Sequence, residues 1–168
     1  MRVSSKAIAG VFLSLAFATP VFAADWVRSE SKAYGFSADF PSKPKEESSS
    51  TSGVPMHSMA AGDTKALCLV VRGDYPNTVD PNVELPASRD SFVKGMSATL
   101  STSKRITFKR GDKTLSAMEF DAASATHNLR SIIVIDGTYA YQVAGAVSKT
   151  DGDPKNLERC VRGFALTP

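Results

Sequence analysis

Two cysteines, Cys68 and Cys160, are the residues whose chemistry the sequence defines most clearly. An even number of cysteines in an exported chain favours a disulfide. Bridging this pair would close a loop of about 90 residues, worth about 4–5 kcal/mol if the bridge acts through chain entropy. The alternative is a pair of buried thiols that pack as small hydrophobic side chains. Because no Cys-x-x-Cys motif is present, we expect a structural bridge and no redox centre.

A Ser-x-x-Lys pattern at Ser91 and Lys94 has the spacing of the nucleophile and base in penicillin-binding serine enzymes. The companion motifs of that class, Ser-Asp-Asn and Lys-Thr-Gly, do not occur in the sequence, and the same Ser-x-x-Lys spacing recurs at Ser29 and Ser101. We therefore expect Ser91 and Lys94 to lie on a helix surface. An envelope hydrolase that uses them is a remote alternative, and we expect no enzyme.

The two histidines, His57 and His127, are too far apart in the sequence to suggest a zinc site. His57 lies near Met56 and Met59, and imidazole and thioether ligands suit copper, but one histidine and two methionines are a weak donor set. His127 falls in an alternating strand pattern, where a structural or solvated histidine is expected. The sequence therefore predicts no metal and no cofactor.

Tyrosines are the remaining candidates for a functional surface, because their rings are amphipathic and suit interfaces. Tyr75, Tyr139 and Tyr141 form the candidate binding surface. We expect a groove between the sheet and residues 73–86 to be the place where they act. Arg-Gly-Asp occurs twice, at Arg72 and at Arg110, and both copies are interpreted as turns at strand ends.

Residues 1–23 have the pattern of a cleavable secretory signal. Arg2 and Lys6 precede an apolar run of about 12 residues that ends before Pro20, too short for the roughly 20 residues that span a bilayer. Small residues up to Ala23 provide a cleavage site, and no cysteine follows for lipid attachment. We expect cleavage after Ala23, no stable membrane anchor, and a periplasmic or secreted protein. An uncleaved anchor is the alternative.

The charge of the mature chain is close to neutral. The whole sequence has 20 basic and 17 acidic residues, and removal of the signal leaves 18 and 17, a net charge of +1. Such a balance gives no electrostatic reason to expect nucleic acid or an anionic membrane as a partner. We therefore expect the partner to be an envelope protein or a small apolar ligand.

The first half of the mature chain alternates strand and turn signals. Short strands are predicted within residues 26–40, where the segment from Phe36 to Phe40 alternates with period two. The serine-rich residues 48–52 predict a mobile loop. Residues 54–60 predict a strand, and the apolar run 66–72 predicts a central strand buried on both faces.

The second half combines two helices with a meander of strands. Residues 73–86 predict a long loop, and residues 88–100 an amphipathic helix with Ser88 as its N-cap. Four strands follow at residues 105–109, 114–121, 127–135 and 138–147, paired around a glycine-containing turn and around Asp136-Gly137. Asp153-Pro154 predicts the start of a last helix whose apolar side carries Cys160. Because Cys68 lies in the predicted central strand, this placement favours the disulfide.

These elements predict one α+β domain over residues 24–168, an antiparallel sheet of about six to seven strands with two main helices packed on it. The segment Tyr-Gly-Phe-Ser-Ala-Asp-Phe-Pro-Ser-Lys-Pro at residues 34–44 resembles the entry strand of small exported bacterial domains with a PsbP-like (DcrB-like) fold. The strand at 141–147 and the helix at 154–166 are also similar. The resemblance implies an α/β/α sandwich and carries over no catalytic residue, because that group shares no catalytic motif.

The functional expectation is a binding role. The export signal, the near-neutral charge and the lack of a catalytic constellation favour a non-catalytic accessory or assembly factor for an envelope protein. The resemblance implies the same, because members of that group are mostly non-enzymatic accessory or assembly factors or are uncharacterised. A small carrier of apolar ligands or lipids, using space between helix and sheet, is the alternative.

Overall fold

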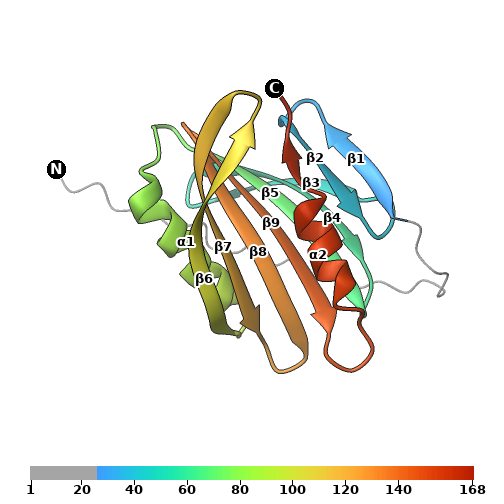
Figure 1. The fold of residues 1–168 in the computed structure, drawn as a ribbon. Coiled ribbons are helices and arrows are strands. Elements are labelled where there is room, and N and C mark those ends of the chain that lie inside the picture. The colour runs from blue at the N-terminus through green and yellow to red at the C-terminus, as the bar shows by residue number, and fades with distance from the viewer. Residues whose placement is uncertain (1–25) are drawn as a thin grey trace.

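In the computed structural model, which describes residues 26–168, a seven-stranded antiparallel sheet forms the centre of the molecule (Figure 1). A smaller antiparallel sheet has the order β1-β2-β10. In spatial order, the large sheet contains β3 (Lys45–Thr51), β4 (Val54–Gly62), β5 (Ala66–Asp74), β9 (Tyr139–Ser148), β8 (His127–Asp136), β7 (Lys113–Ala123) and β6 (Thr99–Arg110). The remaining elements are β1 (Val27–Ser31), β2 (Phe36–Phe40), β10 (Ala165–Leu166), α1 (Pro81–Gly95) and α2 (Lys155–Arg162).

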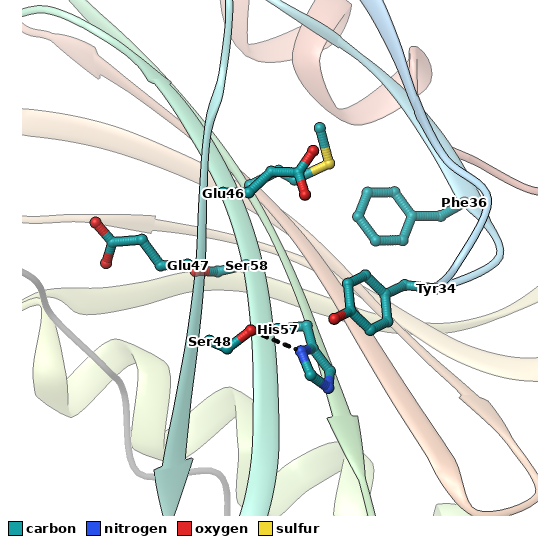
Figure 2. Close-up of a pocket in the computed structure, with 8 residues that line it drawn as sticks. Tyr34, Phe36, Glu46, Glu47, Ser48, His57 and Ser58 are labelled. Carbon is teal, nitrogen blue, oxygen red and sulfur yellow. Dashed lines mark hydrogen bonds between the residues drawn. The ribbon is translucent and has the colours of Figure 1, made fainter.

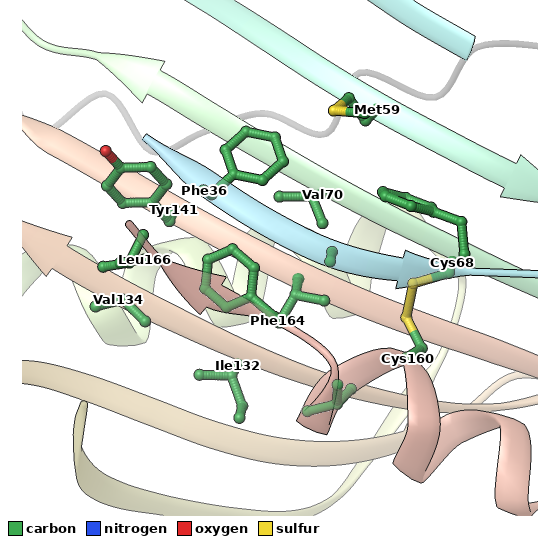
Figure 3. Close-up of a cluster of buried hydrophobic side chains, with 14 of the residues drawn as sticks. Phe36, Met59, Cys68, Val70, Ile132, Val134, Tyr141, Cys160, Phe164 and Leu166 are labelled. Atoms are coloured by element: carbon green, nitrogen blue, oxygen red, sulfur yellow. A yellow bond between two sulfur atoms is a disulfide. The ribbon is translucent and has the colours of Figure 1, made fainter. Parts of the chain in front are cut away.

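The two helices cover opposite faces of the large sheet, so the molecule has three layers (Figure 1). One face packs against α2 and the small sheet, and Figure 3 shows the side chains of this cluster, including Phe36, Tyr141 and Phe164. The other face packs against α1 through Leu85 and Phe92. The α+β class and the predicted two helices are therefore confirmed.

The meander of the second half forms as its turn residues and alternation predict. In β8, Ile132 and Val134 face the α2 side, whereas Ile133 and Ile135 face the α1 side. Gly137, with a φ of 64°, makes the tight turn into β9. The β6–β7 and β8–β9 hairpins are thus confirmed.

The predicted disulfide is confirmed. Cys68 of β5 is bonded to Cys160 of α2, with 5.7 Å between their Cα atoms, and both residues are fully buried (Figure 3). The bridge ties α2 to the middle of the large sheet. Close packing surrounds it, because a Cβ added at Gly145 of β9 would lie only 3.4 Å from the Cβ of Cys160.

Ion pairs join α2 to the large sheet beside the disulfide. Arg130 of β8 contacts Asp121 of β7 at 2.7 Å and Glu158 of α2 at 2.5 Å. Arg162 contacts Glu158 at 2.9 Å and the buried Glu119 of β7 at 2.6 Å. Positive and negative side chains alternate through this network, so the buried carboxylate of Glu119 is neutralised by the guanidinium of Arg162.

The helix α1 begins earlier than the sequence predicted. Its N-cap is Asp80, whose carboxylate accepts a hydrogen bond from the backbone N–H of Asn82 at 2.9 Å. The predicted N-cap, Ser88, is instead buried within the helix. Pro86 lies inside the helix without breaking it. Its missing N–H leaves the Asn82 carbonyl without a helical donor, and Arg105 of β6 approaches that carbonyl from outside at 3.5 Å.

Three other expectations differ from the structure. The serine-rich residues 48–52 are not a mobile loop, because residues 45–51 pair with β4 as the edge strand β3. Arg72-Gly73-Asp74 lies within β5 and is no turn, whereas Gly111, with a φ of 54°, does make the turn after β6. The expected single sheet is two, since β1, β2 and β10 pair only with each other. The two-residue strand β10 is too short to show a period in the sequence.

Candidate binding site

A pocket of about 100 Å³ lies between the edge of the large sheet and the turn that connects β1 to β2 (Figure 2). Its wall on the sheet side comes from β3 and β4, and its opposite wall from the segment that enters β2. The residues that line it are Tyr34, Phe36, Glu46, Glu47, Ser48, His57, Ser58 and Met59.

Strand register places four residues of this pocket on one face of the sheet. Ser48 is directly opposite His57, and Glu46 is directly opposite Met59. Because strand residues two apart point to the same side, these four side chains share the face that looks toward the small sheet. The Ser48 hydroxyl and His57 Nδ1 are hydrogen bonded at 3.1 Å.

Tyr34 forms the opposite wall because a tight turn aims it at the sheet. The carbonyl of Ser31 accepts hydrogen bonds from the N–H groups of Tyr34 and Gly35, and Gly35 has a φ of 71°. The Tyr34 ring stacks on the His57 ring with 3.9 Å between centroids and 18° between planes. Tyr34 and His57 therefore form one aromatic unit that bridges the two sheets.

Arg72 packs against the Tyr34 ring of this unit. Its guanidinium donates two hydrogen bonds to Asp74, at 2.6 and 3.0 Å. Its Cζ lies 3.9 Å from the ring centroid of Tyr139 and 5.5 Å from that of Tyr34. A buried cation is costly unless an anion is paired with it, and Asp74 provides that anion. The fixed guanidinium in turn packs against the rings of Tyr139 and Tyr34 and holds them in place. It is also close to Tyr141, whose centroid is 5.9 Å away.

Ser48, His57 and Asp74 include the residue types of a hydrolase triad, but their geometry does not support a proton relay. His57 Nε2 lies 4.0 Å from Asp74 Oδ2, too far for a hydrogen bond. Both Asp74 oxygens already accept hydrogen bonds from Arg72. In a triad the acid must orient the base. His57 acts here as a wall of the pocket.

Charge at the pocket is unbalanced at one residue. Glu47 pairs with Lys45 at 2.7 Å, and Asp74 pairs with Arg72. Within residues 26–168, Glu46 is an exposed carboxylate without an ion-pair partner. Figure 2 shows its side chain on the Phe36 side of β3, whereas the side chain of Glu47, which also lines the pocket, extends to the other side of the strand. The pocket thus presents one uncompensated negative charge.

The three tyrosines predicted as a binding surface do not form one surface. Tyr139 and Tyr141 lie on the α2 face with 6.4 Å between their rings, and Tyr75 lies on the α1 face. Tyr141 is fully buried and donates a hydrogen bond to the Tyr34 carbonyl at 3.2 Å. Burial raises its pKa above the ordinary value. Tyr141 therefore positions Tyr34 and meets no partner itself.

Tyr75 takes part in a buried polar cluster under α1. Its hydroxyl donates to the carboxylate of Glu84 at 2.9 Å, and the Ser88 hydroxyl donates to the same oxygen at 2.6 Å. Glu84 is only 4% exposed. Burial, followed by the negative charge of Glu84, raises the pKa of Tyr75 far above 10.0. The cluster anchors α1 to the strand end that precedes it.

The other residues considered for chemistry remain apart from the pocket. Lys94 is exposed and Ser91 half-buried near the end of α1. His127 begins β8 and is hydrogen bonded to Thr126 at 2.8 Å. Within residues 26–168, no group of three or more histidine, cysteine, aspartate or glutamate side chains could hold a metal ion.

The site residues predicted from the sequence did not include Tyr34, Glu46, Ser48 or Arg72. Ser52 and Gly53 both have positive φ, 53° and 82°, and make the two-residue turn that sets the β3–β4 register. Serine–glycine at a hairpin was the available signal. The separation of the β1–β2 turn from β3 and β4 in the chain gave no local signal for their contact.

The predicted signal peptide, residues 1–23 with cleavage after Ala23, lies outside the described residues. Among the residues that the structure describes, no helix is long and apolar enough to cross a bilayer.

Comparison with known proteins finds a structural likeness. No family model and no curated protein matches the chain. The solution structure of cyanobacterial PsbP (CyanoP) from Synechocystis sp. PCC 6803 is similar, with a TM-score of 0.56 and 11% identity, over 90% of this chain and 98% of that one. A crystal structure from Bacteroides thetaiotaomicron VPI-5482 aligns with a TM-score of 0.38 and 15% identity over 83% of this chain and 47% of that one. The three layers and the likeness to cyanobacterial PsbP together show that this chain has a PsbP-like fold.

Proposed function

We propose that the chain is an exported, non-catalytic binding domain that serves as an accessory or assembly factor for a cell-envelope protein. The signal-like residues 1–23 and the Cys68–Cys160 disulfide support export, because disulfides persist in oxidising compartments. The proposed binding site is the pocket between Tyr34 and β3.

The observation that carries this proposal is the position of the pocket beside β3, whose outer edge pairs with no other strand within residues 26–168. Strand β3 is the last strand of the large sheet, and Ser48, Ser49 and Ser50 are exposed along it. An edge strand offers unpaired N–H and C=O groups to another polypeptide. A rigid aromatic wall next to that edge, made by Tyr34 and His57, can add side-chain selectivity.

Two alternatives find less support. Pockets for small molecules usually measure about 300–1,000 Å³, whereas this pocket measures about 100 Å³. This size disfavours a lipid or apolar-ligand carrier at this site. The hydrolase alternative would need Ser91 and Lys94, of which Lys94 is an exposed side chain in the last turn of α1.

Site-specific photo-crosslinking in cells tests the proposal. A benzophenone amino acid at Ser50 probes β3, and the same residue at Thr107 probes the opposite sheet edge, β6. We expect one discrete envelope partner from position 50 and not from position 107. The crosslink should disappear when Tyr34→Ala is added. Equal capture from both edges, or capture insensitive to Tyr34→Ala in a folded protein, would refute the proposed site.

Fractionation with N-terminal sequencing tests export in the same cells. The expected product begins at Ala24 and is released with the periplasmic or secreted fraction. A cytoplasmic product that retains residues 1–23 would overturn this part of the proposal.

A further inference from the structure

We infer that the pocket receives a lysine or arginine side chain, carried by an extended segment of the partner that pairs with β3. This inference rests on the proposed binding role and specifies its ligand. Three independent features of the described residues lead to it: an unpaired carboxylate, an aromatic and thioether lining, and a sheet edge in the right orientation.

The first feature is the carboxylate of Glu46. Two other carboxylates near it are paired, since Glu47 of β3 is bound by Lys45, and Asp74 at the end of β5 is bound by Arg72. The carboxylate of Glu46 is therefore the group at this pocket with which a cationic ligand would pair. Because Arg72 is 9% exposed and already held by Asp74, it leaves that anion uncompensated.

The second feature is the lining of soft, electron-rich groups. The half-buried ring of Tyr34 lines one side of the pocket (Figure 2), and the buried side chains of Phe36 and Met59 form its apolar base. Because the Tyr34 ring already stacks on His57, it offers its edge to the methylene stem of a long side chain, while the charged end of that side chain reaches Glu46. A volume of about 100 Å³ admits a single such side chain.

The third feature is the direction of β3. In a sheet, directly opposed residues of neighbouring strands place their side chains on the same face. A strand added outside β3 with a residue opposite Glu46 would therefore point that side chain toward Tyr34 and Phe36. Glu46 and Ser48 already occupy this face of β3. The geometry thus selects an extended polypeptide with a basic residue and not a free apolar molecule.

The expected preference is modest, because an exposed ion pair contributes little in water. Replacing the basic residue by a neutral one should weaken binding about two- to fivefold. Salt should weaken it further, since the attraction to Glu46 is exposed to screening.

Titration of the isotope-labelled mature protein with synthetic peptides provides the test. The probe is a short alternating Thr/Val peptide with one central lysine, compared with the same peptide carrying glutamine. Backbone amide shifts are followed by NMR. We expect the lysine peptide to shift amides of β3, His57 and Tyr34, and to bind more tightly than the glutamine peptide.

Matched variants locate the charge effect. Glu46→Gln should abolish the preference for lysine, whereas Glu47→Gln removes the same charge from the adjacent residue, which points away from Tyr34, and should keep the preference. Equal binding of both peptides to the native protein, no binding of the lysine peptide at millimolar concentration, or equal loss in both variants overturns the inference. The crosslinking experiment at Ser50 reports separately on the proposed function, so a captured partner with no lysine preference would refute only this inference.

Discussion

The two faces of the large sheet hold their helices by different means. On one face, α2 is held by the Cys68–Cys160 disulfide, by ion pairs to β7 and β8, and by packing under the small sheet. On the other face, α1 is held by apolar packing of Leu85 and Phe92 and by hydrogen bonds to one buried carboxylate, Glu84. The difference indicates that α1 opens first when the protein is stressed, while the face that supports Tyr34 stays closed.

Removing the disulfide should reduce the difference in stability between the two faces more than any other change. The double variant Cys68→Ala/Cys160→Ala should lose about 2–5 kcal/mol of unfolding free energy, the usual cost of losing a native bridge. Urea unfolding followed by circular dichroism measures the loss. In the variant, hydrogen exchange should show α2 and α1 opening with similar free energies.

Reduction of the native protein is the matched control, because it removes the bridge and leaves the sequence unchanged. If reduced and oxidised proteins unfold at the same urea concentration, covalent attachment is not what distinguishes the two faces.

Removing the buried carboxylate should weaken the other face. Glu84→Ala leaves the hydroxyls of Tyr75 and Ser88 without their acceptor, and an orphaned buried polar group costs about 1–3 kcal/mol. Hydrogen exchange should accelerate in α1 and stay unchanged in α2. Lys94→Ala, an exposed change on the same helix, is the control and should have little effect. Equal acceleration of both helices would contradict the independence of the two faces.

Lowering the pH should destabilise the α2 face. Partial burial of Asp121 opposes its ionisation, but hydrogen bonds from Arg130 and Thr102 outweigh this and lower its pKa below 3.8. The hydrogen bond from Arg162 lowers the pKa of Glu158 below 4.5. Lowered pKa values stabilise the folded state at neutral pH, and this contribution is lost as pH falls from about 4.5 downward. Urea midpoints from pH 7 to pH 3 should fall less steeply in Glu158→Gln than in the native protein.

Raising the pH should destabilise the α1 face, and we expect this effect to be the smallest of those considered. Because burial and Glu84 raise the pKa of Tyr75 above 10.0, the neutral phenol stabilises the folded state. The unfolded chain loses its proton near pH 10, so this contribution is present below that pH and declines as pH rises beyond it. The urea midpoint of unfolding should fall between pH 9 and pH 11, and it should fall less in Tyr75→Phe. Hydrogen exchange, corrected for the pH dependence of the intrinsic exchange rate, should show the same loss of stability.

Local signals in the sequence predicted the parts of the fold that depend on neighbouring residues. Asp136-Gly137 and the alternation of β8 and β9 defined that hairpin, and Asp153-Pro154 indicated the start of the last helix. Asp80-Pro81 is the same kind of signal at the start of α1. It was missed because the three prolines within residues 73–86 suggested a loop. The last of them, Pro86, lies inside the helix, and Arg105 approaches the carbonyl that it leaves without a helical donor.

The site could not be predicted in this way, because it is made by register and by contact between distant segments. Ser48 meets His57 only because a turn at Ser52 and Gly53 folds a serine-rich segment onto β4. Tyr34 reaches both through packing of the small sheet against the large one. The tyrosines were recognised as a residue type, but only the folded chain shows that Tyr141 is fully buried and hydrogen bonded to Tyr34, whereas Tyr34 itself lines the pocket.

The pairing of β10 with β2 has a consequence for the timing of folding. Phe36 pairs with Leu166, and Cys68 is bonded to Cys160, 92 residues later in the chain. Synthesis must therefore reach α2 and β10 before the bridge or the small sheet can form. Contacts between such distant residues form slowly. The export proposed above requires an unfolded polypeptide, and these late contacts would keep the polypeptide open until α2 and β10 have been made.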